Sequence, residues 1–104
     1  MWAELDPPRG QEQSGRRPVL VISQSVYNDR SGTVIALALT SQEPRASFPL
    51  TLEFNKTKMP KRSWVKISQI RVLAVERVST RIGRVHPDEL EQIIEGLNEI
   101  VGDS

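Results

Sequence analysis

Most apolar residues of this chain fall in short runs that are typical of β-strands, and only its end has the pattern of a helix. Residues 18–23 (PVLVIS) form a β-branched run that opens with a proline, whose missing N–H is not needed at the first position of a strand. Residues 33–39 (TVIALAL) form a second apolar run after the turn-forming residues 27–32. These two segments predict buried strands that pair as a hairpin or lie as close neighbours.

Further strands are expected between this pair and the end of the chain. Residues 48–53 alternate apolar and polar side chains, the period of a strand with one face in water. Shorter apolar runs predict strands at residues 64–67, 70–75 and 81–85. Residues 55–62 are polar, basic and interrupted by Pro60, so we expect a mobile loop there.

A single helix is predicted at residues 87–101. Pro87 suits the first helical position, and the acids that follow it favour the positive end of the helix dipole. The apolar residues then recur at helical spacing. They are Leu90, Ile93, Ile94, Leu97, Ile100 and Val101. Gly102 suits the C-terminal stop.

Many short strands with one terminal helix favour a small, partly open antiparallel barrel, because a parallel sheet needs helices between its strands. A chain of 104 residues supports one core, so we expect a single domain over residues 1–104. Without cysteine, a signal-peptide pattern or an apolar run of about 20 residues, the chain is expected in the cytoplasm.

Composition also narrows the chemistry. The chain has no cysteine, one histidine (His86) and no Gly-rich nucleotide-binding motif, which argues against thiol enzymes, most metal hydrolases, P-loop proteins and Rossmann dehydrogenases. We therefore expect neither a metal nor a cofactor. The net charge of +1 leaves room for a local basic face. Arginines, lysines, acids and hydroxyls remain, and these groups suit the rearrangement of a phosphodiester.

Such groups concentrate in the loop at residues 6–17, which holds Arg9, Glu12, Arg16 and Arg17. Arg17 precedes Pro18, which pushes it to an extended conformation at the start of a strand, where its planar guanidinium can hold a phosphate through two N–H groups. From spacing alone, solvated loop charges are the commoner interpretation.

Residues 2–23 closely resemble the opening motif of the MazF/PemK toxins, in which an aromatic residue and a proline precede Gly-x-Glu-Gln-x-Gly-x-Arg-Pro-Val-Leu-Val. Further matches lie in the family's order along nearly the whole chain. They are Tyr27-Asn28, Thr40-Ser41, Gln69-Ile70-Arg71 and the segment Gly83-x-Val85-x-Pro87-x-x-Leu90. The resemblance implies an SH3-like barrel of the CcdB/Kid/MazF kind.

The resemblance also implies a toxin of a type II toxin–antitoxin system that inhibits translation. It would be a metal-independent, sequence-specific endoribonuclease that cleaves single-stranded RNA to 2′,3′-cyclic phosphate and 5′-OH ends. Carried over from the family, the catalytic residues are Arg17, Thr40 and Glu12. Arg17 would stabilise the crowded phosphate, Thr40 would add a neutral hydrogen bond, and Glu12 would accept the 2′-OH proton if it is partly desolvated.

The expected RNA-binding residues are Arg16, Lys56, Lys58, Lys61, Arg62, Lys66, Ser68 and Gln69. Some family members carry an acid beside this glutamine, whereas here Ser68 takes its place. Lys66 and Ser68 are therefore expected to hydrogen-bond the RNA backbone. The basic run at residues 56–62 could equally be a solvated loop with no RNA contact. We expect structural roles for Trp2 and Trp64, and a capping or surface role for His86.

As partners, the resemblance implies a homodimer and a cognate acidic antitoxin of the MazE kind, whose disordered segment occludes the active site. An alternative from another class is a non-enzymatic inhibitor of a DNA topoisomerase, as CcdB-type toxins are. Those toxins are expected to lack the Glu-Gln-x-Gly-x-Arg-Pro motif. An SH3-like adaptor is disfavoured because few aromatic residues are present to line a groove.

Overall fold

The computed structural model describes residues 2–5 and 17–102, and at residues 2–5, 17 and 79–82 it describes the backbone alone. The elements are β1 (Trp2–Leu5), β2 (Arg17–Val21), α1 (Ser25–Ser31), β3 (Thr33–Thr40), β4 (Thr51–Glu53), β5 (Trp64–Ala74), the 3₁₀ turn η1 (Val75–Arg77), β6 (Val78–Gly83) and α2 (Pro87–Val101). The described strands form one antiparallel sheet in the order β4-β5-β3-β2-β1-β6. The predicted fold class, mainly antiparallel β with a C-terminal helix, is confirmed.

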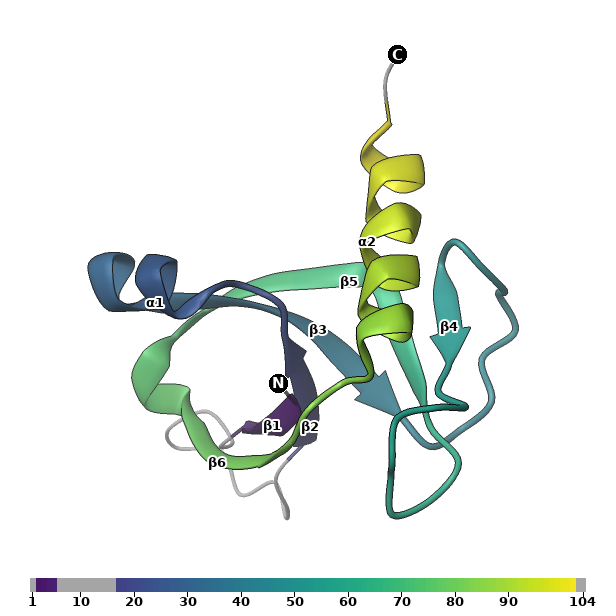
Figure 1. Ribbon diagram of the computed structural model, residues 1–104, viewed down its shortest axis with the longest axis horizontal. Helices are drawn as coiled ribbons and strands as arrows, with labels where there is room; N and C mark the ends of the chain where they lie inside the picture. Colours follow the sequence, from purple (N-terminus) through teal and green to yellow (C-terminus); the bar gives the residue numbers. More distant parts are fainter. Residues whose placement is uncertain (1, 6–16, 103–104) are drawn as a thin grey trace.

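The sheet curls around on itself but does not close. Figure 1 shows β1, β2, β3 and β6 arranged around an open ring, with α2 rising from the other side of the sheet. β4 and β6 are the two edges and do not pair with each other, as in the partly open barrel that the sequence predicts. In the described part of the chain, no helix is long and apolar enough to cross a membrane.

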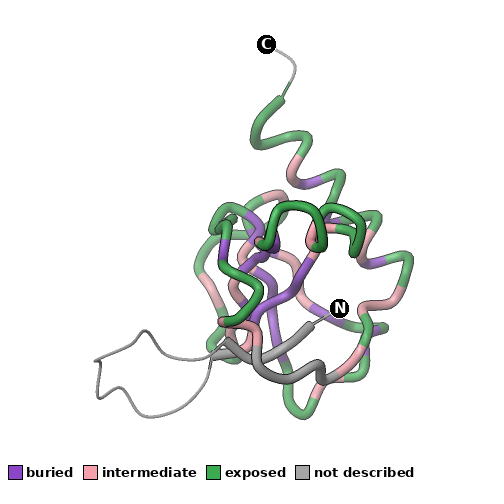
Figure 2. The backbone as a smooth tube through the Cα atoms, turned by 90° about the vertical axis from the view of Figure 1, so that its left-hand side faces the viewer, coloured by how far each residue is buried: buried purple, intermediate pink, exposed green. Residues whose placement is uncertain are grey.

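Both faces of the central strands are covered, which explains why β2 and β3 read as continuous apolar runs. Side chains alternate between the faces of a strand. On one face, residues inside the curl form a cluster of Val19, Val21, Val34, Ala36 and Leu73. On the other face, α2 contributes Ile93 to a cluster with Leu20, Leu37, Leu39, Phe54, Val65 and Ile67. Figure 2 shows the buried positions along the strands and the exposed C-terminal end of α2 projecting away from them.

The predicted turn at residues 27–32 lies mostly within α1, a helix of two turns. None of its side chains is buried, so it carries no apolar stripe that a periodicity argument can detect. The helix ends at Gly32, whose positive φ of 71° suits glycine and whose N–H donates to the carbonyl of Asn28 at 2.9 Å. The Ser23 hydroxyl also donates to the Asn28 side chain at 2.6 Å.

Four of the predicted strands need correction. The predicted strands at 64–67 and 70–75 belong to the single strand β5, which is irregular where the break was expected. The strand predicted at 81–85 occurs as β6 at Val78–Gly83. The strand predicted at 48–53 is limited to β4, because the N–H groups of Leu50 and Thr51 both donate to the carbonyl of Ser47 in a turn.

Gly96 sets how closely α2 approaches the sheet. A Cβ atom at this position would lie 2.9 Å from Cδ1 of the buried Ile67 and 3.2 Å from the carbonyl oxygen of Pro49. We expect Gly96→Val to lower the free energy of unfolding by about 2 kcal/mol, because the larger side chain overpacks a tight contact. Urea denaturation measures this change. Asn98→Ala on the exposed face is the control, expected within about 0.5 kcal/mol of wild type; equal stability of the two variants contradicts the packing role of Gly96.

Candidate functional site

Three polar side chains meet where strands β3, β4 and β5 lie side by side. In the strand register Lys66 pairs with both Ala38 and Thr51, and Thr40 pairs with Trp64. Residues that pair across strands point to the same face of a sheet. Thr40, Thr51 and Lys66 therefore share a face, and it is opposite to the face that α2 covers.

An irregularity in β5 adds two more polar residues to this region. The pairing passes from Leu37 with Ile70 to Ala38 with Lys66, so residues 67–69 bulge out of the ladder. Ile67 is fully buried in the core under α2. Ser68 and Gln69 are exposed instead, which leaves their polar groups free to meet a ligand.

These residues line an open pocket of about 390 Å³, which we take as the candidate site. Four predicted site residues line it: Thr40, Lys66, Ser68 and Gln69. The loop between β3 and β4 supplies residues that the sequence pattern does not indicate, namely Gln42, Glu43 and Arg45, and β4 adds Thr51. The one sequence signal for these three loop residues is that they follow Thr40 closely along the chain.

Thr40 has a hydroxyl group that can donate to a ligand. Its Oγ1 accepts a hydrogen bond from the backbone N–H of Gln42 at 3.1 Å. Its own O–H has only a long contact of 3.5 Å with the carbonyl oxygen of Gln42. A contact of that length is weak, so a well-placed phosphate oxygen can replace it.

Arg17 is the first residue of β2, and only its backbone is described. β2 pairs with β3 through Val19 with Ala38, Leu20 with Leu37 and Val21 with Ala36. The last pair of this ladder, Val19 with Ala38, lies two residues from Arg17 on β2 and two residues from Thr40 on β3. The predicted site residues Glu12 and Arg16 lie outside the described residues.

The predicted basic residues 56–62 do not line this pocket, and two of them are held in ion pairs. The Lys56 ammonium lies 2.7 Å from the carboxylate of Asp88, which raises the pKa of Lys56 and lowers that of Asp88. Arg62 makes a two-point hydrogen bond with Glu53, which lowers the pKa of that carboxyl. Such exposed pairs stabilise the fold little.

Arg62 also stacks on a tryptophan. Its guanidinium carbon lies 4.8 Å from the centre of the Trp64 ring, and Trp64 is only 7% exposed. The expected structural role of Trp64 is thus confirmed. Lys58 and Lys61 are exposed and have no ion-pair partner among the described residues.

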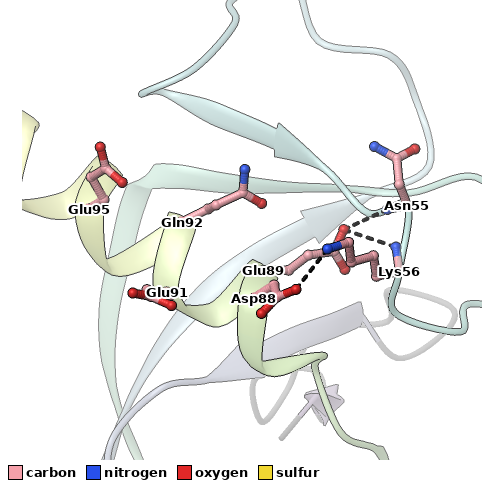
Figure 3. A pocket seen from close by; sticks show the side chains of 7 residues that line it. All are labelled: Asn55, Lys56, Asp88, Glu89, Glu91, Gln92 and Glu95. Carbon is pink, nitrogen blue, oxygen red and sulfur yellow. Dashed lines mark hydrogen bonds and ion pairs between the residues drawn. The ribbon is translucent and has the colours of Figure 1, made fainter.

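The start of α2 lies beside the same loop and is hydrogen-bonded to it (Figure 3). Glu89 is 3% exposed, and its carboxylate accepts hydrogen bonds from the N–H groups of Asn55, Lys56 and Thr57 and from the Thr57 hydroxyl, at 2.6 to 3.0 Å. Burial raises the pKa of Glu89, but these hydrogen bonds outweigh it and the net pKa is lowered. His86 caps α2 by accepting from the N–H of Asp88, as predicted.

The described residues contain no group of three or more histidine, aspartate or glutamate side chains that could hold a metal ion. Besides the carboxylate of Glu43, the pocket combines hydroxyl groups, amides and two cationic side chains, Lys66 and Arg45. This donor set suits the phosphates and base edges of a nucleic acid.

Comparison with known proteins gives a match along nearly the whole chain. Residues 1–101 match the family of PemK-like, MazF-like toxins of type II toxin–antitoxin systems. The chain is 35% identical to the endoribonuclease MazF6 of Mycobacterium tuberculosis over 103 residues, covering 96% of this chain and 90% of the relative. It is 31% identical to the endoribonuclease toxin MazF of Escherichia coli over 104 residues, covering 98% and 89%.

Solved structures share the fold. The crystal structure of MazF from Deinococcus radiodurans superposes with a TM-score of 0.77 at 26% identity, covering 98% of this chain and 93% of that one. An endoribonuclease in complex with its cognate antitoxin from a mycobacterial species superposes with a TM-score of 0.77 at 21% identity, covering 96% and 89%.

Glu89 predicts an acid-sensitive fold. The pKa of Glu89 in the folded protein lies below the ordinary value of 4.5. Its contribution to the stability of the fold is therefore present above pH 4.5 and is lost as pH falls through the folded pKa. Asp88 and Glu53, with lowered pKa values, act in the same direction. We expect urea midpoints to fall steeply below about pH 4.5.

Glu89→Gln should flatten this dependence, because a neutral amide cannot lose charge in acid. Glu91→Gln, at an exposed position on the same helix, is the control and should keep the wild-type pH profile. The same slope in Glu89→Gln and wild type contradicts this role of Glu89.

Proposed function

Because the chain belongs to the PemK-like, MazF-like toxin family of type II toxin–antitoxin systems, we propose that it is a sequence-specific endoribonuclease that cleaves single-stranded RNA without a metal and so stops translation. The observation that carries this proposal is that the chain is 31% to 35% identical to curated endoribonucleases over nearly its full length. The pocket beside Thr40 supports it, because its hydroxyl groups, amides and cations suit an RNA strand.

The proposed reaction uses the RNA as its own nucleophile. The 2′-oxygen attacks the adjacent phosphorus and its proton passes to a base, while the bond from phosphorus to the 5′-oxygen breaks and that oxygen takes up a proton. The products are a 2′,3′-cyclic phosphate and a 5′-OH end. DNA lacks the 2′-OH and is spared.

We assign the roles to Arg17, Thr40 and Glu12. The Arg17 guanidinium stays charged at neutral pH and stabilises the extra negative charge on the phosphate in the transition state. Thr40 donates its hydroxyl hydrogen to a phosphate oxygen, and Glu12 takes the 2′-OH proton. The β2–β3 ladder, which ends two residues from both Arg17 and Thr40, supports a shared phosphate site. Lys66, Ser68, Gln69 and Arg16 then bind the flanking RNA.

The partners follow from the same family. We propose that a cognate acidic antitoxin covers the basic site, because the solved relatives include MazE–MazF structures from D. radiodurans. We place the toxin in the cytoplasm, where its RNA is, and take residues 1–104 as one toxin domain. The alternative, a topoisomerase inhibitor of the CcdB kind, has no supporting observation among these relatives.

A homodimer accounts for apolar surface that α2 leaves open. Ile70 and Val72 are 52% and 63% exposed, and they continue the face of β5 whose other half packs under α2. Ile94 and Val101 are exposed on α2 itself. A second copy covering these side chains removes a patch of the kind that marks an interface.

The activity is tested with purified protein and a long single-stranded RNA in EDTA, followed by mapping of the ends. We expect cleavage at a recurring short motif, with cyclic phosphate on one side and 5′-OH on the other. Arg17→Ala should lower the rate by at least about 10³-fold, because the main charge stabilisation is removed.

Arg30→Ala, on the exposed α1, is the matched control and should keep full activity. Cleavage that requires a divalent metal, or an Arg17→Ala variant as active as wild type, rules out the proposed mechanism. Inhibition of a topoisomerase without RNA cleavage would establish the alternative class.

Val72→Asp should convert the dimer to a monomer, because a charged group in an apolar interface is left unpaired. Light scattering after size-exclusion chromatography measures the mass, with the exposed Gln92→Ala as the control. A dimer of undiminished stability in Val72→Asp shows that this face is not the interface.

A further inference from the structure

Among the residues whose side chains the structure describes, Glu89 is the only charged one that is buried. Its Oε2 accepts from the N–H groups of Asn55 and Lys56 at 2.7 and 3.0 Å, and its Oε1 accepts from the N–H and hydroxyl of Thr57 at 2.8 and 2.6 Å. Figure 3 shows the carboxylate pointing from α2 to the loop. Three consecutive backbone N–H groups thus converge on one side chain, which restrains the loop strongly.

The network extends to the residue that caps α2. The Thr57 hydroxyl oxygen also accepts a hydrogen bond from the N–H of His86 at 2.9 Å. The start of the loop is therefore tied to α2 through both Glu89 and His86.

The other end of this loop is also held. The N–H of Phe54 donates to the carbonyl of Ser63 at 3.0 Å, and the Ser63 hydroxyl donates to the carbonyl of Lys61 at 2.8 Å. Arg62 is held by Glu53 and by the Trp64 ring. Between the two ends, half-buried Met59 packs against the core. The expected mobile loop is therefore tied to the body of the protein at several points.

Only the middle of the loop presents free positive charge. Lys56 is occupied by Asp88 and Arg62 by Glu53, whereas Lys58 and Lys61 are exposed without an ion-pair partner in the described part of the chain. The loop also reaches the pocket wall, because Nη1 of Arg62 lies 3.8 Å from the carboxylate of Glu43, which lines the pocket. Through Arg62, the loop that carries Lys58 and Lys61 thus adjoins the pocket wall at Glu43.

We infer that Glu89 is a positioning residue for RNA: by holding the backbone of residues 55–57, it keeps Lys58 and Lys61 placed to bind phosphates that flank the cleaved bond. The inference rests on the proposed function and assigns Glu89 no contact with the RNA. The physical reason is preorganisation, since a loop that is already ordered loses less entropy when its lysines bind.

The test is a double-mutant cycle on RNA cleavage with the full chain. It compares wild type, Glu89→Gln, the pair Lys58→Ala/Lys61→Ala, and the triple variant, measuring kcat, KM and the salt dependence of KM on one long RNA. Glu89→Gln should raise KM by about tenfold with kcat unchanged, because flanking phosphates and not the reacting one are affected.

The lysine pair should lower the slope of log affinity against log salt by about 1.4, which is about 0.7 for each phosphate that is no longer bound. Adding Glu89→Gln to the lysine pair should then change KM no further, because the positioned groups are gone. A purely structural role of Glu89 would lower stability without this dependence on the two lysines. Glu91→Gln, on the same helix, is the control and should match wild type.

If Glu89→Gln does not fold, Thr57→Ala replaces it. This change removes the hydroxyl bond to Glu89 and the bond from the His86 N–H, and it leaves the three bonds from backbone N–H groups to Glu89. Thr57→Ala should also raise KM in the wild-type background. It should leave KM unchanged when it is added to the Lys58→Ala/Lys61→Ala pair. An unchanged KM in the single variants, or an equal rise in both backgrounds, overturns the inference. Wild-type protein that leaves RNA intact instead overturns the proposed function, so the two failures are distinct.

Discussion

The pairing of β3 with β5 is the constraint on which the rest of the structure depends. Thr33–Thr40 pairs along Trp64–Ala74 from Thr33 with Ala74 to Thr40 with Trp64. One face of this ladder supplies Leu37, Val65 and Ile67 to the core under α2. The other face brings Thr40 and Lys66 to the candidate site. A one-residue slip would exchange the two faces, so the hydrophobic core and the site are fixed by the same register.

Much of the fold could be predicted from the sequence, because its strands are strongly apolar. The predicted bounds of β2, β3 and α2 lie close to the observed ones. The helix α1 could not be predicted because no side chain of it is buried, so helix and turn look alike in its sequence. The pattern divides β5 at Ser68 because two polar residues interrupt the apolar run, whereas the backbone absorbs them as a bulge.

The site was predictable where its residues belong to strands. Thr40, Lys66, Ser68 and Gln69 were named from the sequence and line one pocket, while Gln42, Glu43 and Arg45 depend on how a loop folds back. The sequence predicts Lys56 and Arg62 as RNA contacts. In the structure both are in ion pairs, with acidic partners on α2 and β4 that lie far away in the sequence or on another element. The role of Glu89 could not be predicted because it binds backbone groups of residues 32 to 34 positions away. The roles of all these residues in RNA binding and cleavage stay predictions, and Glu12 and Arg16 also lie outside the described residues.

The proposed chemistry depends on the ribose hydroxyl that precedes the broken bond. The most direct measurement places a single 2′-deoxynucleotide at the mapped cleavage position of an otherwise unmodified RNA. Loss of cleavage at that position alone, with neighbouring deoxy substitutions tolerated, is the result that transesterification by the 2′-oxygen predicts. Cleavage that proceeds there at the unmodified rate would show that water or a side chain attacks instead, and it would remove the proposed roles of Arg17, Thr40 and Glu12 together.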